Sequence, residues 1–202
     1  SGLVARDLSK AMLDYPGGRS PGAGVEWREA DAARLPFADG EFGAVLCSFG
    51  VMFVPDRRAA FREARRVLKP GGIFLFNVWD RIEENQHALA QEQLVEALFP
   101  GDPEVRFRAP FEMHDPALLR SLLAESGFRE TKIEKKGMRV GGIAARTVAL
   151  GQIRGTPRSL LLQKRGADLD EVVARLAAAL TEVGGDPYRG RTQAIVVEAQ
   201  AV

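Results

Sequence analysis

Residues 42–79 read FGAVLCSFGVMFVPDRRAAFREARRVLKPGGIFLFNVW. Phe42–Phe49 is a near-continuous apolar run, which is typical of a strand that is covered on both faces. Asp56 predicts a helix start, and the helix ends at Lys69–Gly72 because proline cannot continue a helix and glycine accepts the left-handed cap. Ile73–Trp79 is a second buried strand. Strand, helix and strand therefore alternate, as in a parallel α/β sheet.

The same alternation extends in both directions along the chain. The sequence predicts an α/β fold in a single domain over residues 1–202, with a doubly wound and mostly parallel sheet. The further expected strands are Leu3–Ala5, Val25–Arg28, Phe128–Lys135 and Ala194–Val197. Further helices are expected at Leu8–Leu13 and Glu83–Leu98, after Asp115, after Asp168, and in the less clearly patterned segment Ala144–Arg165. Tyr15–Gly24 is rich in glycine and proline and is expected to be a loop.

Composition excludes several classes of function. The chain has 28 basic and 27 acidic residues, so its net charge of +1 gives no electrostatic signal for nucleic acid or an anionic membrane. Cys47 is the only cysteine, so an internal disulfide and a zinc site built from several thiolates are excluded. There is no apolar run of about 18 residues and no signal-peptide pattern, and we expect a cytoplasmic protein.

Two carboxylates follow predicted strand ends, where open parallel sheets bind ligands. Asp7 has the geometry to accept hydrogen bonds from both hydroxyls of a ribose, or to cap the helix that follows it. Asp31 lies beside the small residue Ala32, an arrangement suited to an adenine amino group. The alternative for Asp31 is an ordinary surface aspartate in a loop.

The segment after the central strand offers an apolar wall. Ser48, Phe49 and Phe53 lie there, and Phe49 is nearest the strand end. Met52 is better explained by core packing. His87 and His114 lack the spacing of metal ligands, so no metal site is predicted. A cluster of arginines on the helix of residues 57–68 is expected to face solvent; these are Arg57, Arg58, Arg62, Arg65 and Arg66.

Taken together, five segments resemble class I S-adenosylmethionine (SAM)-dependent methyltransferases. In chain order they are the DLSKAML segment at Asp7–Leu13, Asp31-Ala32 followed by Leu35-Pro36-Phe37, the strand and loop Phe42–Phe53, LKPGG at Leu68–Gly72, and LLAESGF at Leu122–Phe128. The likeness covers residues 3–137 well and the last strand moderately. It is nearest to the branch that includes the ubiquinone and menaquinone biosynthesis C-methyltransferases.

The resemblance implies a Rossmann-like fold, SAM as cofactor, and a small acceptor that is apolar or aromatic. It implies that Asp7 binds the ribose, Leu8 packs at the adenine, Asp31 and Ala32 meet the adenine edge, and Ser48 and Phe49 lie beneath the reacting centre. Phe49, Phe53 and Trp79 would line the acceptor pocket, with packing of Trp79 in the core as an equal alternative. No catalytic base is identified. Segments 85–113 and 144–187 are expected to form a helical lid.

Two departures from the family pattern stand out. Gly43 replaces an aspartate that is common at the start of that strand, and nothing precedes Leu3 to supply the first strand and its glycine-rich loop. That strand would lie between the strand ending at Asp7 and the strand Gly43–Ser48. We therefore expect this chain not to hold the standard sheet by itself, unless upstream residues, a rearrangement or a strand from a second copy close the gap. By the same reasoning the chain as written is expected to bind SAM poorly and to lack activity on its own.

Two other functions stay open at this point. A nicotinamide-dependent oxidoreductase uses the same kind of sheet, although the LPF and LKPGG segments argue against it. The other is a nucleoside-binding or interaction domain without catalysis.

Overall fold

The computed structural model describes residues 2–9, 13–14 and 24–202, in two compact units. The sheet unit comprises Ser1–Asn77, Pro116–Ile133 and Val197–Val202, and the helical unit comprises Val78–Asp115 and Glu134–Val196. Predictions on residues 10–12 and 15–23, which include most of the helix expected at Leu8–Leu13 and of the loop at Tyr15–Gly24, lie outside the described residues.

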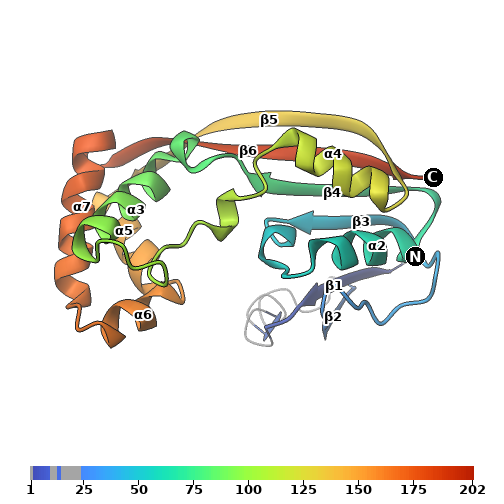
Figure 1. Cartoon of the computed structure of the whole chain (residues 1–202), viewed down its shortest axis with the longest axis horizontal. Coiled ribbons are helices and arrows are strands. Elements are labelled where there is room, and N and C mark those ends of the chain that lie inside the picture. Colours follow the sequence, from blue (N-terminus) through green and yellow to red (C-terminus); the bar gives the residue numbers. More distant parts are fainter. Residues whose placement is uncertain (1, 10–12, 15–23) are drawn as a thin grey trace. The chain divides into compact units, whose positions relative to one another are not determined.

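The elements alternate as an α/β fold (Figure 1). The strands are β1 (Leu3–Asp7), β2 (Val25–Glu29), β3 (Phe42–Ser48), β4 (Leu68–Trp79), β5 (Phe128–Ile143) and β6 (Tyr188–Ala201). The α-helices are α2 (Arg57–Val67), α3 (Gln86–Leu98), α4 (Pro116–Glu125), α5 (Ala145–Arg154), α6 (Arg158–Lys164) and α7 (Leu169–Gly184), with short 3₁₀ turns η1 (Val51–Phe53), η2 (Ile82–Glu84) and η3 (Ala109–Phe111). The predicted α/β class is confirmed.

The described strands form two sheets. β1 pairs with β2 in parallel, and a second sheet has the order β3-β4-β6-β5, with β3 and β4 also parallel. Among the described strands none pairs with the second edge of β1 or with the second edge of β3. The pairing of strands is therefore interrupted between β1 and β3, where the family pattern places its first strand.

The coverage predicted for β3 is wrong. Phe42–Ser48 does form a strand, but its residues are exposed or only half-buried, and Leu46 is 71% exposed. Leu3 on β1 is 64% exposed. Both residues lie on strands with one unpaired edge among the described strands, and this accounts for the exposure of apolar side chains that a central strand would bury.

Helix α2 and strand β4 build the core of the sheet unit. Asp56 caps α2, since its Oδ1 accepts from the Ala59 amide at 2.8 Å. Phe61 is fully buried and meets Phe74 and Phe76 edge-on, with ring centroids 5.5 and 5.3 Å apart. Such aromatic pairs add to the free energy gained by burying apolar area.

Strand β4 begins earlier than predicted. Leu68 already pairs with Phe42, and the KPGG turn is accommodated as a shift of register between Phe42 and Ala44. At Gly72 a Cβ would meet the Lys69 carbonyl oxygen at 2.9 Å and the Gly43 carbonyl oxygen at 3.1 Å, so only glycine fits. The turn that ends α2 thus also starts the neighbouring strand.

The helical unit has a core of its own. Helices α3, α5 and α7 contribute its buried apolar side chains, among them Val95, Ala149 and Leu176. The helix predicted for Ala144–Arg165 is confirmed as the pair α5 and α6, and Asp168 caps α7 by accepting from the amides of Asp170 and Glu171. The strands that flank these helices, β5 and β6, are much longer than predicted.

Candidate functional site

Asp7 and the segment carrying Asp31 lie at one sheet edge. β1 and β2 run parallel with Asp7 opposite Glu29, so the carboxyl ends of both strands coincide. The Ala30 amide donates to the Asp7 carbonyl oxygen at 3.1 Å, which ties the two strand ends together. Both predicted carboxylate positions are thus neighbours in space, as a site at the carboxyl ends of parallel strands requires.

Each of the two carboxylates is exposed and oriented by its own loop. Asp7 Oδ1 accepts from the Ser9 amide at 2.8 Å, and Asp31 Oδ1 accepts from the Ala33 amide at 2.8 Å. These local bonds engage one oxygen of each carboxylate and limit the rotation of the side chain. Carboxylates of this kind accept hydrogen bonds from hydroxyl and amino groups.

Phe49 has an unusual backbone at the carboxyl end of β3. Its φ of 51° makes it the only residue other than glycine with a positive φ among the described residues. Its amide donates to the Asn77 carbonyl oxygen on β4 at 3.2 Å, so the strained conformation is held in place. A non-glycine residue held in the left-handed region costs on the order of 1–3 kcal/mol, and such residues cluster at functional sites.

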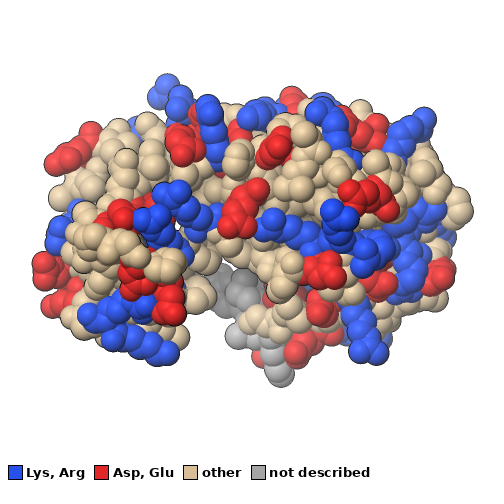
Figure 2. Space-filling view, in the orientation of Figure 1, with Lys and Arg blue, Asp and Glu red and all other residues tan. Residues whose placement is uncertain are grey.

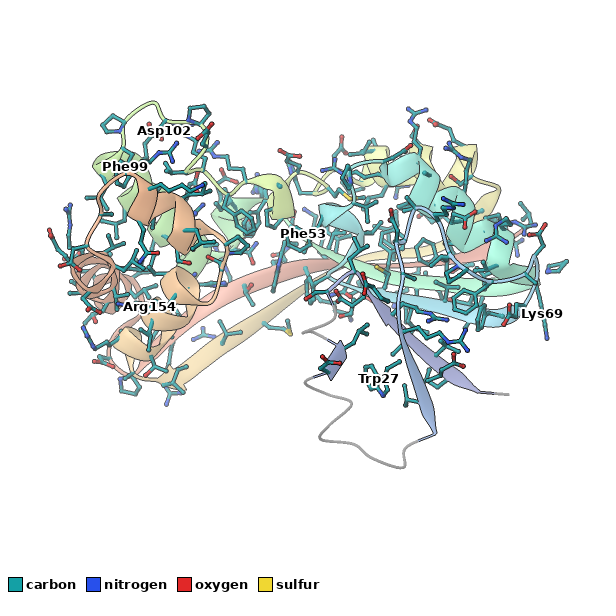
Figure 3. All side chains as sticks on the ribbon, turned by 90° about the horizontal axis from the view of Figure 1, so that it is seen from below. Trp27, Phe53, Lys69, Phe99, Asp102 and Arg154 are labelled. Atoms are coloured by element: carbon teal, nitrogen blue, oxygen red, sulfur yellow. The ribbon has the colours of Figure 1, made fainter. Side chains whose placement is uncertain are left out.

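The other predicted residues occupy different surroundings. Leu8 is 62% exposed beside Asp7, Ala32 is half-buried, and Ser48 is exposed at the end of β3. Phe53 is 51% exposed and lies beyond the carboxyl end of β3, whereas Lys69 lies near the other end of the strands (Figure 3). Trp79 is half-buried and lies in the helical unit, while Phe49 and Phe53 lie in the sheet unit, so a pocket formed by all three stays a prediction.

Sequence reasoning missed the role of Arg66, which does not lie on a solvated face. All five of its N–H groups are used. Nε and Nη2 donate to the two Glu63 oxygens at 2.7 and 2.8 Å, Nη1 donates to Phe37 O at 2.7 Å and to Asp39 Oδ1 at 2.8 Å, and Nη2 also donates to Leu35 O at 2.9 Å. These bonds raise the pKa of Arg66. A guanidinium is suited to this task because its donors form a rigid planar fork.

Glu63 completes the same arrangement. Its Oε2 accepts from the Leu35 amide at 2.7 Å, and the hydrogen bond from Arg66 lowers the pKa of the Glu63 carboxyl. The neighbouring Arg65 also binds backbone, donating from Nε to Gly127 O at 3.2 Å and to Val202 O at 3.1 Å. The carbonyl oxygens of the LPF segment need donors because they lack strand partners, but nothing in their side-chain types points to Arg66 as the donor.

The lowered pKa of Glu63 predicts a dependence of stability on pH. A carboxyl whose pKa is depressed by folding stabilises the protein above its unfolded pKa of about 4.3, and this contribution is lost as pH falls through the folded pKa. The free-energy difference between the wild type and Glu63→Gln should therefore be largest near pH 7 and should shrink below about pH 4. Urea unfolding at several pH values measures it, and a difference that is the same at pH 7 and pH 3 contradicts the assignment.

Asp80 follows strand β4 and is fully buried. Its Oδ2 lies 2.8 Å from Lys135 Nζ and accepts from Gln193 Nε2 at 2.9 Å. Asn85 is also fully buried, and its Nδ2 donates to the carbonyl oxygens of Asp80 and Arg81. These bonds fix the turn that leads from β4 into α3, and a carboxylate so enclosed serves the local structure.

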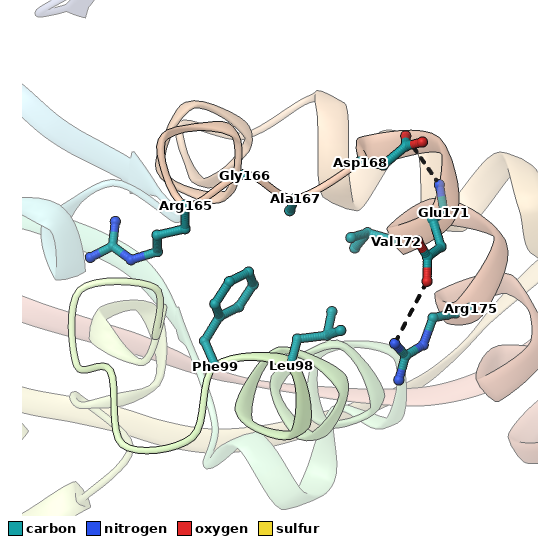
Figure 4. A pocket seen from close by; sticks show the side chains of 9 residues that line it. All are labelled: Leu98, Phe99, Arg165, Gly166, Ala167, Asp168, Glu171, Val172 and Arg175. Atoms are coloured by element: carbon teal, nitrogen blue, oxygen red, sulfur yellow. Dashed lines mark hydrogen bonds and ion pairs between the residues drawn. The ribbon is translucent and has the colours of Figure 1, made fainter.

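The helical unit also holds a small pocket of about 170 Å³ (Figure 4). Its walls combine apolar side chains with charged groups that are already paired, as in the ion pair of Arg165 with Glu104. The lining residues are Leu98, Phe99, Arg165, Gly166, Ala167, Asp168, Glu171, Val172 and Arg175. None of the predicted cofactor residues lines this pocket.

Metal-ligand clusters are not found among the described residues. No group of three or more His, Cys, Asp or Glu side chains in that part of the chain has a metal-binding arrangement. None of its helices has the length and apolar character needed to cross a membrane. On the face drawn in Figure 2, basic and acidic side chains are interspersed.

Comparison with known proteins finds a likeness in the N-terminal part of the chain. Residues 2–76 match the family described as "Methyltransferase domain". A ubiquinone/menaquinone biosynthesis C-methyltransferase, UbiE, of Caulobacter sp. is 52% identical over 72 residues, which is 32% of this chain and 28% of that protein. An uncharacterized protein of Mycobacterium tuberculosis is 42% identical over 72 residues, 35% of this chain and 26% of that protein. The matched segments thus span about a quarter of the length of these relatives.

Solved structures extend the likeness in fold to the whole chain. The YcgJ protein of Bacillus subtilis superposes with a TM-score of 0.62 at 17% identity, covering 99% of this chain and 82% of that one. A SAM-dependent methyltransferase of Methanosarcina mazei superposes with a TM-score of 0.55 at 17% identity, covering 100% and 82%. The predicted resemblance to class I SAM-dependent methyltransferases and the predicted Rossmann-like fold are confirmed.

Proposed function

We propose that this chain, which carries the methyltransferase domain over residues 2–76, is the SAM-binding and acceptor-binding part of a methyltransferase that acts on a small molecule. The observation that carries the proposal is the pair of oriented carboxylates, Asp7 and Asp31, at one sheet edge. The backbones of the two strand ends are joined by the 3.1 Å bond from the Ala30 amide to the Asp7 carbonyl oxygen. Asp7 would bind the ribose hydroxyls, and Asp31 with Ala32 would bind the adenine edge, while Leu8 packs against it.

The chemistry asked of the protein is chiefly positioning. SAM supplies a methyl group on a sulfonium that is already activated, and holding the reactants in line accounts for much of the acceleration. Ser48 and Phe49 would lie beneath the reacting centre, and the backbone of Phe49, with its φ of 51°, sets the direction in which its side chain leaves the chain. A general base is needed only where the acceptor loses a proton during the reaction.

We infer an acceptor that is apolar or aromatic. The support is the aromatic character of Phe49, Phe53 and Trp79, of which Phe53 exposes half of its surface beyond the end of β3. The segments 85–113 and 144–187 would cover this acceptor as a lid, since they add helices to the minimal fold. An acceptor found outside these residues in a ligand-bound structure would refute the pocket.

In protein that also carries the first strand and glycine-rich loop of the family pattern, Asp7→Ala is expected to weaken SAM binding roughly 10- to 150-fold, because a hydrogen bond to a charged group contributes about 1.5–3 kcal/mol. Isothermal titration calorimetry of SAM and of S-adenosylhomocysteine measures the change, and both ligands should lose the same factor since they share the ribose.

A matched control is Glu29→Ala. Glu29 is an exposed carboxylate opposite Asp7 in the parallel pair, so its removal changes the local charge without removing the proposed contact. Unchanged affinity in Asp7→Ala, or an equal loss in Glu29→Ala, would leave Asp7 with only its bond to the Ser9 amide.

A second function is also tested, because proteins with this fold carry out more than one type of reaction. The [4+2]-cyclase SpnF superposes on 99% of this chain with a TM-score of 0.57 at 20% identity. Fold alone does not assign a reaction. Titration of SAM, NAD and NADP, followed by an assay for methyl transfer to a panel of aromatic acceptors, separates methyl transfer, hydride transfer and a non-catalytic nucleoside-binding role.

A further inference from the structure

The loop after β2 is held by one guanidinium from another element. Residues 35–39 have no strand partner, and the Arg66 side chain binds the carbonyl oxygens of Leu35 and Phe37 and the carboxylate of Asp39. Glu63 receives the Leu35 amide and fixes the Arg66 fork from the opposite side. The Arg66 backbone adds a further bond, since its carbonyl oxygen accepts from the Gly40 amide at 2.8 Å.

This loop continues directly from the Asp31 turn. The Arg34 amide donates to the Asp31 carbonyl oxygen at 3.0 Å, and the Ala33 amide donates to the Asp31 carboxylate. The turn at residues 31–34 and the loop at 35–39 are therefore joined without a flexible break. A displacement of Leu35 would move the Asp31 carboxylate with it.

The same loop also reaches the strand that carries Asp7. The Arg6 guanidinium carbon lies 4.4 Å from the centroid of the Phe37 ring, and Phe37 meets Phe42 edge-on at 4.7 Å. Cation–π contacts of this kind stabilise by about 0.5–2 kcal/mol. Arg66 therefore fixes the backbone of Phe37. The Phe37 ring in turn packs against Arg6, the residue before Asp7.

We propose that Arg66, oriented by Glu63, is a positioning residue that holds the turn after β2 in the arrangement that recognises the adenine of the cofactor; this rests on the proposed function. The residue does not touch the cofactor. It acts by fixing residues 35–39, and thereby the distance and direction of the Asp31 carboxylate relative to the end of β1. Arg66 therefore contributes to base selectivity as well as to affinity.

The test compares S-adenosylhomocysteine with S-inosylhomocysteine, which lacks the adenine amino group. The wild type is expected to prefer the adenine ligand by at least 10-fold by calorimetry. Arg66→Met should lower the affinity for S-adenosylhomocysteine at least 10-fold and bring the ratio of the two affinities close to 1. Arg66→Lys should lie between them, because a single ammonium does not reproduce the fork. Glu63→Gln should retain part of the selectivity, since its amide oxygen still accepts.

The matched control is Arg65→Met. Arg65 lies on the same helix and also binds backbone carbonyl oxygens, but those of Gly127 and Val202 instead of the loop. Its removal should lower stability and leave the ratio of the two affinities unchanged. All titrations are run at temperatures where thermal unfolding shows each variant to be folded, so that lost stability is not read as lost affinity.

Hydrogen exchange gives a readout that needs no ligand. In Arg66→Met the amides of residues 33–38 should exchange faster, while in Arg65→Met they should exchange as in the wild type. The inference is overturned if Arg66→Met keeps the wild-type preference for adenine, if Arg65→Met loses it equally, or if exchange in the loop is unchanged. The titrations use protein that also carries the first strand and glycine-rich loop of the family pattern. In that protein, a wild type that binds neither SAM nor S-adenosylhomocysteine overturns the proposed function and this inference with it, whatever exchange shows of the loop.

Discussion

Phe61→Ala is expected to lower the free energy of unfolding by about 3–5 kcal/mol, the usual cost of truncating a buried aromatic residue. Phe61 is fully buried in α2, and its ring meets those of Phe74 and Phe76, so three rings lose contacts together. Folded domains have only about 5–15 kcal/mol in total, so the variant should be close to unfolding. Urea unfolding followed by circular dichroism measures the loss.

Two further variants serve as controls for the loss of stability in Phe61→Ala. Phe61→Leu keeps much of the apolar volume and should lose less than half as much. Leu160→Ala removes a side chain of α6 that is 64% exposed and should stay within about 0.5 kcal/mol of the wild type. A loss below about 1 kcal/mol in Phe61→Ala would contradict the packing of α2 on β4.

Arg158→Met is expected to cost about 3–5 kcal/mol, because it leaves a buried carboxylate without its main partner. Arg158 and Glu92 have side chains that are 3% and 5% exposed, and Arg158 Nη2 lies 2.9 Å from Glu92 Oε2. Burial lowers the pKa of Arg158, but a guanidinium stays protonated. After the substitution Glu92 keeps Arg108, at 3.3 Å, as its remaining cationic partner.

The double variant Glu92→Leu with Arg158→Met distinguishes two causes of destabilisation. One is the loss of the ion pair, and the other is a buried Glu92 carboxylate left without its main partner. Replacing both members of a buried ion pair by apolar residues is often neutral, so the double variant should be more stable than Arg158→Met alone. Thermal unfolding of the two variants and the wild type at pH 7 gives this order. A double variant less stable than the single one would show that Glu92 stabilises the helical unit through its other contacts, such as Arg108.

The order of elements was predictable because strong local signals mark it. Asp56, Asp168 and Pro116 begin helices as predicted, since capping and proline act within a few residues. The lengths of β5 and β6 were not predictable. β5 extends to Ile143 through Gly137, Gly141 and Gly142, and such glycines usually argue against a strand.

Some positions of the candidate site could likewise be predicted from the sequence, and others could not. Asp7 and Asp31 were predictable, because strand ends in a parallel sheet fix where following residues lie. Arg66 was not, because its partners Leu35 and Phe37 are some 30 residues away and offer only backbone carbonyl oxygens, which carry no signal in side-chain type. Burial of Asp80 likewise depends on Lys135 and Gln193, which only the folded chain brings near.

The left-handed backbone of Phe49 bears on how this protein would respond to selection in the laboratory. Glycine adopts a φ near 51° without steric strain, so Phe49→Gly relieves the backbone but gives up the contacts of a half-buried ring and raises the entropy of the unfolded chain. A library screened for turnover of an aromatic acceptor would keep the ring. If the ring contacts the acceptor as proposed, a screen for heat resistance alone would place no such demand on this position, because only turnover depends on an aromatic surface there.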